Sequence, residues 1–386
     1  MAIIKISKKK IDLDIELALE ILSASSFIML TVMKLSSSLK SVLSIIEILI
    51  GVIILIYFVY KYRASKALIV IISLLLFSGL LNLVFVKAIS VRILVKMFLV
   101  HLPISLVLLK NKKLNPPIWL GCFIFLALFL LYRLFYNGYY IFYDTSRNYI
   151  SMVLIISAFI YEISLKKNDL DVNIFIPFII LISSIVAQGR GGIISSILLF
   201  VLYIFFRYFV NVGGKKDLRW FLKIIFLCAV FIILLIYLYI NFDSIINQFF
   251  PRFTFQQSKS TVESNETRVL FYTSYFNGIK NIKNFMLGFN LIGTSWVATH
   301  EGGNIHNSYL QVHSYLGLTG FVIFVVGFFR ALKSIYLNKQ YLFFVFAVGF
   351  LLRIGTDFTL PGGVGDIIFW YVIFMNLSCF KNTIEK

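Results

Sequence analysis

VLSIIEILIGVIILIYFVY, residues 42–60, is an unbroken apolar run with one charged side chain, Glu47. A bilayer has a hydrocarbon core about 30 Å thick, and a helix needs roughly 20 mostly apolar residues to cross it. This run therefore predicts a transmembrane helix. Similar runs predict further crossings, and the full set of twelve lies near residues 17–33, 42–60, 67–86, 93–109, 118–136, 149–165, 173–187, 193–209, 220–240, 306–329, 341–354 and 365–380.

The composition of the whole chain indicates the same class of protein. Hydrophobic residues make up 60% of the chain and charged residues only 14%, and the mean hydropathy is +0.92. A water-soluble domain of 386 residues would hardly tolerate these values. We predict an all-α, polytopic membrane protein with about 12 crossings and one large extracytoplasmic loop.

The basic residues predict how the chain is oriented. The formal net charge is +19, but the basic residues form short clusters between apolar runs, which is typical of membrane topology and not of a nucleic-acid-binding face. If the N-terminus is cytoplasmic, about 22 of the 36 Lys and Arg residues lie on the cytoplasmic side. Both termini are then cytoplasmic, and no nucleic-acid partner is expected.

One long connection separates two groups of predicted crossings. Residues 1–240 contain about nine crossings, residues 241–305 form an extracytoplasmic loop, and residues 306–386 contain about three crossings. Connections in compact folds usually have about six residues, so a loop of this length should be partly ordered and functional. Its segment from Glu266 to Phe285 has the pattern of a helix.

His306 begins the most informative motif, HNSYLQVHSYLGLTG at residues 306–320. An imidazole at the membrane boundary can be neutral near physiological pH and can accept a proton from a hydroxyl group, so His306 is a candidate general base. A histidine that caps a helix at the interface would explain the position equally well.

Two arginines are candidates for binding an anion. Arg190, in the sequence GRGG at residues 189–192, interrupts an apolar stretch, and a guanidinium group there suits a phosphate. Arg268 lies near the start of the predicted loop helix, where backbone N–H groups also attract phosphate. The alternatives are a snorkelling Arg190 in a short external turn and a solvated Arg268 on the surface.

The remaining candidate groups have simpler explanations. Arg353 and Asp357 are spaced as a substrate-binding pair or as a structural ion pair. The chain shows no His, Cys or carboxylate cluster with the spacing of a zinc site, so we expect no metal and no cofactor. The three cysteines lie inside apolar runs and are interpreted as core residues.

Three motifs together resemble those of the O-antigen polymerase and O-antigen ligase superfamily. In that superfamily a His followed by a small polar residue precedes a Gly-x-x-Gly element, as His306–Asn307 precedes Gly317 and Gly320 here. GRGG is similar to its short Arg-Gly element, with Gly189 in place of the usual Ser. The segment NETRVLFYTSYFNGIKNIKNFMLGFN, residues 265–290, resembles its loop helix, and the resemblance covers roughly residues 175–375.

The resemblance implies an activity and a role for each candidate residue. The donor would be an oligosaccharide on undecaprenyl pyrophosphate, used without a metal at the outer face of the bacterial cytoplasmic membrane. Arg190 and Arg268 would hold the pyrophosphate, and His306 would orient or deprotonate the attacking sugar hydroxyl. Further substrate-binding candidates are Asn307, Arg353, Tyr272, Tyr309 and His313, and for the last three an aromatic belt or core packing is the alternative.

Three functions stay open at this point. The first is a polymerase of lipid-linked repeat units for O-antigen or capsular polysaccharide. The second is a ligase that moves finished chains to another acceptor. The third, from a different class, is a transporter that flips the lipid-linked unit across the membrane, although the sequence shows no internal repeat of the kind common in transporters. The expected partners are membrane lipid, a flippase and a chain-length regulator.

Overall fold

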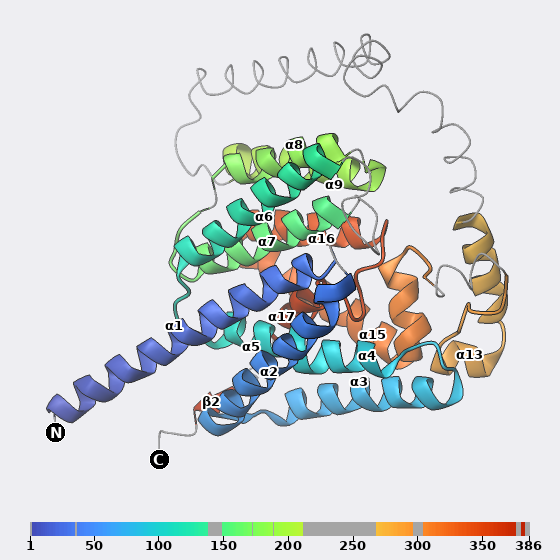
Figure 1. Cartoon of the computed structure of the whole chain (residues 1–386), viewed down its shortest axis with the longest axis horizontal. Coiled ribbons are helices and arrows are strands. Elements are labelled where there is room, and N and C mark those ends of the chain that lie inside the picture. The colour runs from blue at the N-terminus through green and yellow to red at the C-terminus, as the bar shows by residue number, and fades with distance from the viewer. Residues whose placement is uncertain are drawn as a thin grey trace, which may run out of the picture.

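The structure is a computed structural model that describes residues 2–34, 37–137, 149–171, 173–187, 189–210, 268–295, 304–375 and 380–382. Most of these residues lie in helices that form one bundle (Figure 1). Eight helices in this part of the chain are long and apolar enough to cross a membrane, and three apolar helices are shorter. The chain is therefore a membrane-embedded helical protein. The predicted crossing at 220–240 lies outside the described residues, and the total of twelve stays a prediction.

The N-terminal helices run back and forth along one side of the bundle. They are α1 (Ala2–Val32), α2 (Ser37–Lys61), α3 (Lys66–Phe85), and a continuous segment of α4 (Val91–Lys96), the π-helix η1 (Met97–His101) and α5 (Leu102–Lys110). A short strand, β1 (Tyr62–Ala64), follows α2 and pairs antiparallel with β2 (Phe380–Asn382) near the C-terminus. Capping serines begin α3 and α4: Ser65 accepts from the Leu68 amide, and Ser90 accepts from the Ile93 amide.

The centre of the bundle is α7 (Tyr149–Lys166), which is mostly apolar and is buried on every side. In its membrane-length window 94% of the residues are buried, compared with 22% in α3. A helix that is apolar all round must be surrounded by other helices or by lipid, and α7 is surrounded by helices. Those packed against it are α6 (Pro116–Asn137), α8 (Phe175–Ala187), α9 (Arg190–Phe205) and α16 (Tyr341–Ile354). The π-helix η2 (Phe206–Val210) continues α9.

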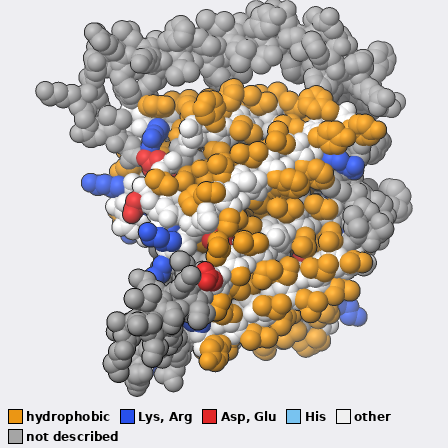
Figure 2. Space-filling model, turned by 60° about the vertical axis from the view of Figure 1, so that its left-hand side comes forward, with side chains coloured by type: hydrophobic (Ala, Val, Ile, Leu, Met, Phe, Trp, Pro, Cys, Tyr) orange, Lys and Arg blue, Asp and Glu red, His pale blue; other side chains and the backbone are white. Residues whose placement is uncertain are grey.

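The outer surface of the bundle is apolar where lipid would contact it. Figure 2 shows a wide band of hydrophobic side chains, with Lys and Arg toward two opposite edges and with Asp and Glu mainly toward the left-hand one. Exposed aliphatic side chains follow one face of α2, namely Val42, Ile45, Leu49, Ile53 and Ile56. Such a surface would aggregate in water but is stable in a bilayer.

The described part of the long connection contains two short helices where the sequence predicted one. The first covers 268–278, the chain turns at 279–281, and α13 (Ile282–Leu287) follows. Asn281 ends the continuous helix that was predicted from Glu266 to Phe285, because its side chain accepts a hydrogen bond from the Lys283 amide and caps α13. Phe271, Tyr275, Leu291 and Ile305 form a small hydrophobic core for this region.

The two helices dock into a break in α15 (Ser308–Leu337). At Gly317 the backbone has φ of +59° and ψ of −167°, which interrupts the helix. The freed carbonyl oxygens are bonded by α3: Asn82 Nδ2 donates to Ser314 O at 2.8 Å, and Ser78 Oγ donates to Leu316 O at 2.5 Å. Asn82 Nδ2 also donates to Leu287 O at 2.7 Å, so one side chain joins α3, α13 and α15.

These contacts define two opposite ends of the bundle, the loop end and the strand end. The loop end contains the segment 282–290, the end of α3 and the beginning of α15, and Asn290 Nδ2 donates there to Lys87 O at 2.9 Å. The strand end contains β1, β2 and the Lys61–Glu16 ion pair at 3.1 Å. Figure 1 shows α13 on one side of the molecule and the N-terminus on the other.

Replacing Gly317 with alanine should lower the thermal stability of the purified protein in detergent. A Cβ at this position would overlap the Met286 carbonyl oxygen, and alanine would be strained at the observed φ, so we expect a loss of about 2 kcal/mol or more. Gly121→Ala on α6 is the matched control, because a Cβ at Gly121 meets nothing within 4 Å. Equal melting temperatures for the two variants would contradict the docking at Gly317.

Candidate functional site

His306 lies at the loop end, directly before α15, in a conformation that its neighbours fix. Its φ of +54° is uncommon for a residue other than glycine. The His306 amide donates to Asn304 Oδ1 at 2.9 Å, and the Ile305 amide donates to Gln311 Oε1 at 2.9 Å. The half-buried imidazole stacks over Phe271, with ring centroids 6.2 Å apart and an interplanar angle of 11°. The ring orientation is therefore set from both the loop and α15.

Arg268 shares this neighbourhood through the helix at 268–278. It precedes Phe271 by three residues, and residues three and four apart lie on one face of a helix. The Arg268 side chain is half-buried, and Tyr272 packs against the same hydrophobic core as Phe271. The stack between Phe271 and His306 therefore places the helix of Arg268, the predicted anion-binding residue, beside His306, the predicted base.

The residues after His306 connect α15 to the turn that follows α16. Asn307 caps α15, and its side chain accepts from the amides of Tyr309 and Leu310. Ser308 Oγ donates to Asp357 O at 2.8 Å and accepts from the Thr359 amide at 2.9 Å. The Tyr309 hydroxyl donates to Leu351 O at 2.6 Å. Asn307 and Tyr309, both predicted to bind substrate, therefore make hydrogen bonds within the protein.

Arg353 is a buried arginine whose guanidinium group is bonded to other side chains. Its side chain is 1% exposed. Nε donates to Ser151 Oγ at 3.0 Å, Nη1 donates to Thr356 Oγ1 at 2.9 Å, and Nη2 donates to Asp357 Oδ2 at 2.9 Å. An arginine in a membrane protein is stabilised by such partners, so these contacts favour a positioning role for Arg353 over direct substrate contact.

The Arg-Gly element packs directly on this arginine network. Gly189 caps α9, and Arg190 is the first residue of that helix. A Cβ at Gly191 would lie 2.5 Å from Thr356 Oγ1, and a Cβ at Gly192 would lie 2.8 Å from Ser151 Cβ. The glycines therefore allow the start of α9 to approach two partners of Arg353. The structure does not describe the Arg190 side chain, so only the backbone position of Arg190 bears on its predicted role.

His313 joins the loop helices to α15 and has both ring nitrogens within hydrogen-bond distance of protein atoms. Nδ1 lies 2.5 Å from the Tyr275 hydroxyl, and Nε2 lies 2.8 Å from Phe285 O. Burial raises the pKa of Tyr275 well above its ordinary value, so its hydroxyl stays protonated. The His313 contacts favour a structural role over the substrate-binding role that the resemblance implied.

The sequence did not reveal a buried pair formed by His101 and Asp366. His101 Nδ1 lies 2.9 Å from Asp366 Oδ2, which also accepts from the Gly362 amide at 2.7 Å. Asp366 begins α17 (Asp366–Met375), and His101 ends η1, so the pair fixes the turn that carries Asp357. The signal for this pair in the sequence was one histidine and one aspartate, each inside a separate apolar run. Among the described residues, no group of His, Cys, Asp and Glu could hold a metal ion.

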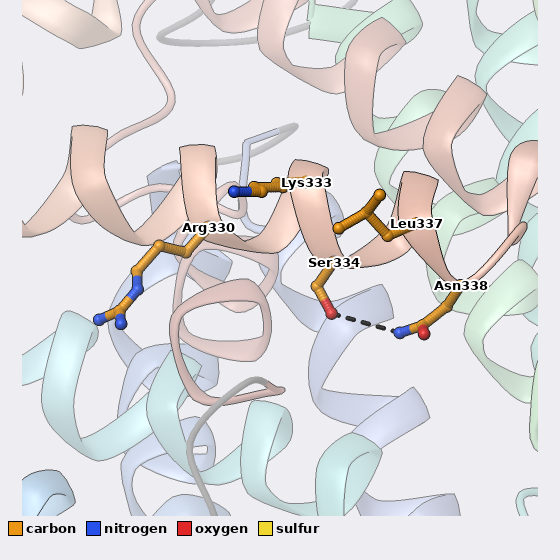
Figure 3. Close-up of a pocket in the computed structure, with 5 residues that line it drawn as sticks. All are labelled: Arg330, Lys333, Ser334, Leu337 and Asn338. Atoms are coloured by element: carbon orange, nitrogen blue, oxygen red, sulfur yellow. Dashed lines mark hydrogen bonds between the residues drawn. The ribbon is translucent and has the colours of Figure 1, made fainter.

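A second polar surface lies elsewhere and is not part of this site. Arg330, Lys333, Ser334, Leu337 and Asn338 line an open pocket on the last turns of α15, far along that helix from Ser308 (Figure 3). Asn338 Nδ2 donates to Ser334 Oγ at 3.3 Å. All five residues come from one stretch of chain, so the pocket lacks the convergent groups of a catalytic site.

No protein-family model matches the chain, and no curated protein matches it. Any function must therefore be argued from the motifs and from the geometry at the loop end.

The contact between the Arg-Gly element and α7 can be tested by a pair of substitutions. Gly192→Ala should destabilise the protein by about 2 kcal/mol, because the new methyl group would overlap the Ser151 side chain. Ser151→Gly removes that side chain, and the double variant should be more stable than the sum of the single effects by about 1 kcal/mol. Thermal unfolding in detergent measures this coupling. Strict additivity would contradict the contact.

The role of His313 can be separated from that of a substrate contact. Tyr275→Phe should lower stability by about 1–3 kcal/mol, because it leaves His313 Nδ1 without its hydroxyl partner. Tyr272→Phe is the control, because Tyr272 is only half-buried beside the same core. Chemical unfolding monitored by fluorescence checks both variants. A Tyr272→Phe effect as large as that of Tyr275→Phe would contradict the assigned role.

Proposed function

We propose that this protein is a membrane-embedded glycosyltransferase that polymerises undecaprenyl-pyrophosphate-linked oligosaccharide repeat units. The observation that carries the proposal is the convergence of three sequence motifs at the loop end. Phe271 joins the Arg268 helix to His306, Ser308 joins the His306 segment to Asp357, and Thr356 contacts the Arg-Gly element. These motifs are far apart in the sequence, and the convergence supports a common site.

The residues at the loop end suit a displacement at an anomeric carbon. A hydroxyl of the acceptor sugar attacks that carbon, the bond from the carbon to the pyrophosphate oxygen breaks, and the configuration inverts. His306 accepts the hydroxyl proton, and Arg190 and Arg268 stabilise the charge on the departing pyrophosphate. Two guanidinium groups can supply the positive charge that a divalent metal ion supplies in other transferases.

The proposed reaction takes place on the extracytoplasmic face of the bacterial cytoplasmic membrane. The loop end carries the long connection, and the basic clusters that predict the cytoplasmic side lie at the strand end, as with Lys61 and Lys110. The product would be O-antigen or capsular polysaccharide. A flippase would deliver the substrate to this face, and a chain-length regulator would be a further partner.

Arg190→Ala, Arg268→Ala and His306→Asn should each reduce chain growth by about 100-fold or more, because each removes a group that stabilises the transition state. Asparagine is chosen at His306 because it tolerates positive φ better than alanine does. Arg268→Lys should also be impaired, since an ammonium group cannot replace the planar fork. The measurement is the size distribution of surface polysaccharide and lipid-linked sugars in cells that lack the gene and carry each variant.

Lys280→Ala and Lys283→Ala are matched controls, because both remove an exposed positive charge from the same segment as Arg268. The variants must accumulate in the membrane at wild-type levels. Single repeat units without a ladder would support a polymerase, whereas long chains retained on the carrier would indicate a ligase. Repeat units trapped on the cytoplasmic face would indicate a transporter. Full activity in all three site variants would refute the assignment.

A further inference from the structure

The short helix α13 exposes an apolar surface that the candidate site does not use. Ile282 is 72% exposed and Met286 is 47% exposed, and Phe285 is exposed as well. Residues three and four apart lie on one side of a helix, so these three side chains form one surface, the α13 face. An apolar face on a connecting segment indicates contact with an apolar partner.

Hydrogen bonds hold α13 beside the last turns of α3 and not beyond the end of that helix. Asn82 Nδ2 donates to the carbonyl oxygen of Leu287, the last residue of α13, at 2.7 Å. Asn82 precedes Phe85, where α3 ends, by about one helical turn. The end of α13 therefore lies level with the last turn of α3.

The break in α15 places α13 at the same level from another side. A Cβ at Gly317 would overlap the carbonyl oxygen of Met286, so the two backbones are in contact. The residue before the break, Leu316, has its carbonyl oxygen bonded by Ser78 Oγ, and Ser78 lies about two turns before the end of α3. Met286 is thus held alongside two helices that are long and apolar enough to cross a membrane.

The surface of α3 beside α13 is apolar up to its last residue. Val84 and Phe85 are exposed, and the exposed face continues along α3 through Leu80 and Phe77. Figure 1 shows α13 at the edge of the molecule, beside the end of α3. The α13 face therefore continues, at the same level, a surface that suits hydrocarbon.

The backbone groups at the ends of α13 are bonded by side chains. His313 Nε2 lies 2.8 Å from Phe285 O, Asn82 Nδ2 donates to Leu287 O, and Asn281 caps the beginning of the helix. A helix end in water can leave such groups to the solvent, whereas an end against hydrocarbon needs partners within the protein. These bonds allow α13 to lie against lipid.

We propose that α13 is an interfacial helix whose α13 face contacts the hydrocarbon chains of lipids in the leaflet at the loop end. The long connection then returns to the bilayer at α13 instead of lying wholly in water. Lipid is the partner that fits, because a side chain that points away from the bundle at the level of α3 meets lipid. The inference goes beyond the proposed function and does not rest on it, since a ligase or a transporter could carry the same helix.

Spin labels on α13 test the proposal in the full-length protein, reconstituted into nanodiscs of phosphatidylcholine. A nitroxide is attached at Ile282→Cys or at Met286→Cys, and each labelled variant must melt at the temperature of its parent. The parent carries alanine in place of the three cysteines of the chain, Cys122, Cys228 and Cys379. The measurement is the ratio of collisions with oxygen, which partitions into hydrocarbon, to collisions with a water-soluble nickel chelate.

Two control positions calibrate this ratio. Phe77→Cys, on the exposed face of α3, gives the value in lipid, and Lys112→Cys, exposed between α5 and α6, gives the value in water. The labels on α13 should match Phe77→Cys and exceed Lys112→Cys several-fold. A ratio equal to that of Lys112→Cys would overturn the proposal, because the α13 face would then lie in water. Few collisions with either reagent would also overturn it, because another part of the chain or a second copy would then cover the face.

Oxidation by hydroxyl radicals gives a second test that needs no substitution. In the same nanodiscs, a methionine side chain in contact with water is oxidised readily to the sulfoxide. Met286 should be oxidised as slowly as Met152, which is fully buried on α7, because lipid excludes water from both. Oxidation of Met286 many times faster than that of Met152 in the folded protein would refute the contact with lipid.

Discussion

The hydrogen bonds of Asn82 are the interaction on which the loop end depends. Inside a bilayer every backbone carbonyl needs a partner, so a helix can break only where other groups replace the lost bonds. α15 breaks at Gly317, and Asn82 and Ser78 of α3 bond the carbonyl oxygens of Ser314 and Leu316. The same Asn82 amide holds the Leu287 carbonyl, so the break in α15 becomes the docking point for the loop.

This docking explains how a long connection can be held in one position at the candidate site. A long external connection usually has few contacts with its scaffold, but here α13 is held to α3 and α15 through Asn82 and His313. The helix at 268–278 then rests on His306 through Phe271. Arg268 and His306 are thereby positioned by residues that are themselves buried, as the catalytic roles proposed for them require.

The sequence predicted the class of fold and the motifs, but not the contacts between them. Apolar runs report the crossings directly, because lipid selects composition over a length of about 20 residues. They cannot report that Gly191 meets Thr356 or that His101 meets Asp366, since each contact joins segments distant in the chain. Nor can they report that Asn281 divides the loop helix, since that division depends on one cap. His313 was assigned by resemblance to a substrate path, whereas its hydrogen bonds are internal.

Buried polar residues are expensive in a membrane, and their distribution therefore indicates where a protein needs them. The first half of α15 and its neighbours hold Ser308, Gln311, His313, Ser314 and Arg353, all buried. On α7 the buried polar side chains Ser157, Glu162 and Ser164 lie further along the helix, whereas Ser151 lies at the loop end, where it meets Arg353. Buried polar side chains also lie away from the motifs, as at Glu20 and Glu162, so the group around the motifs is one of several, and it is the group that the proposed handling of a pyrophosphate and a sugar would require.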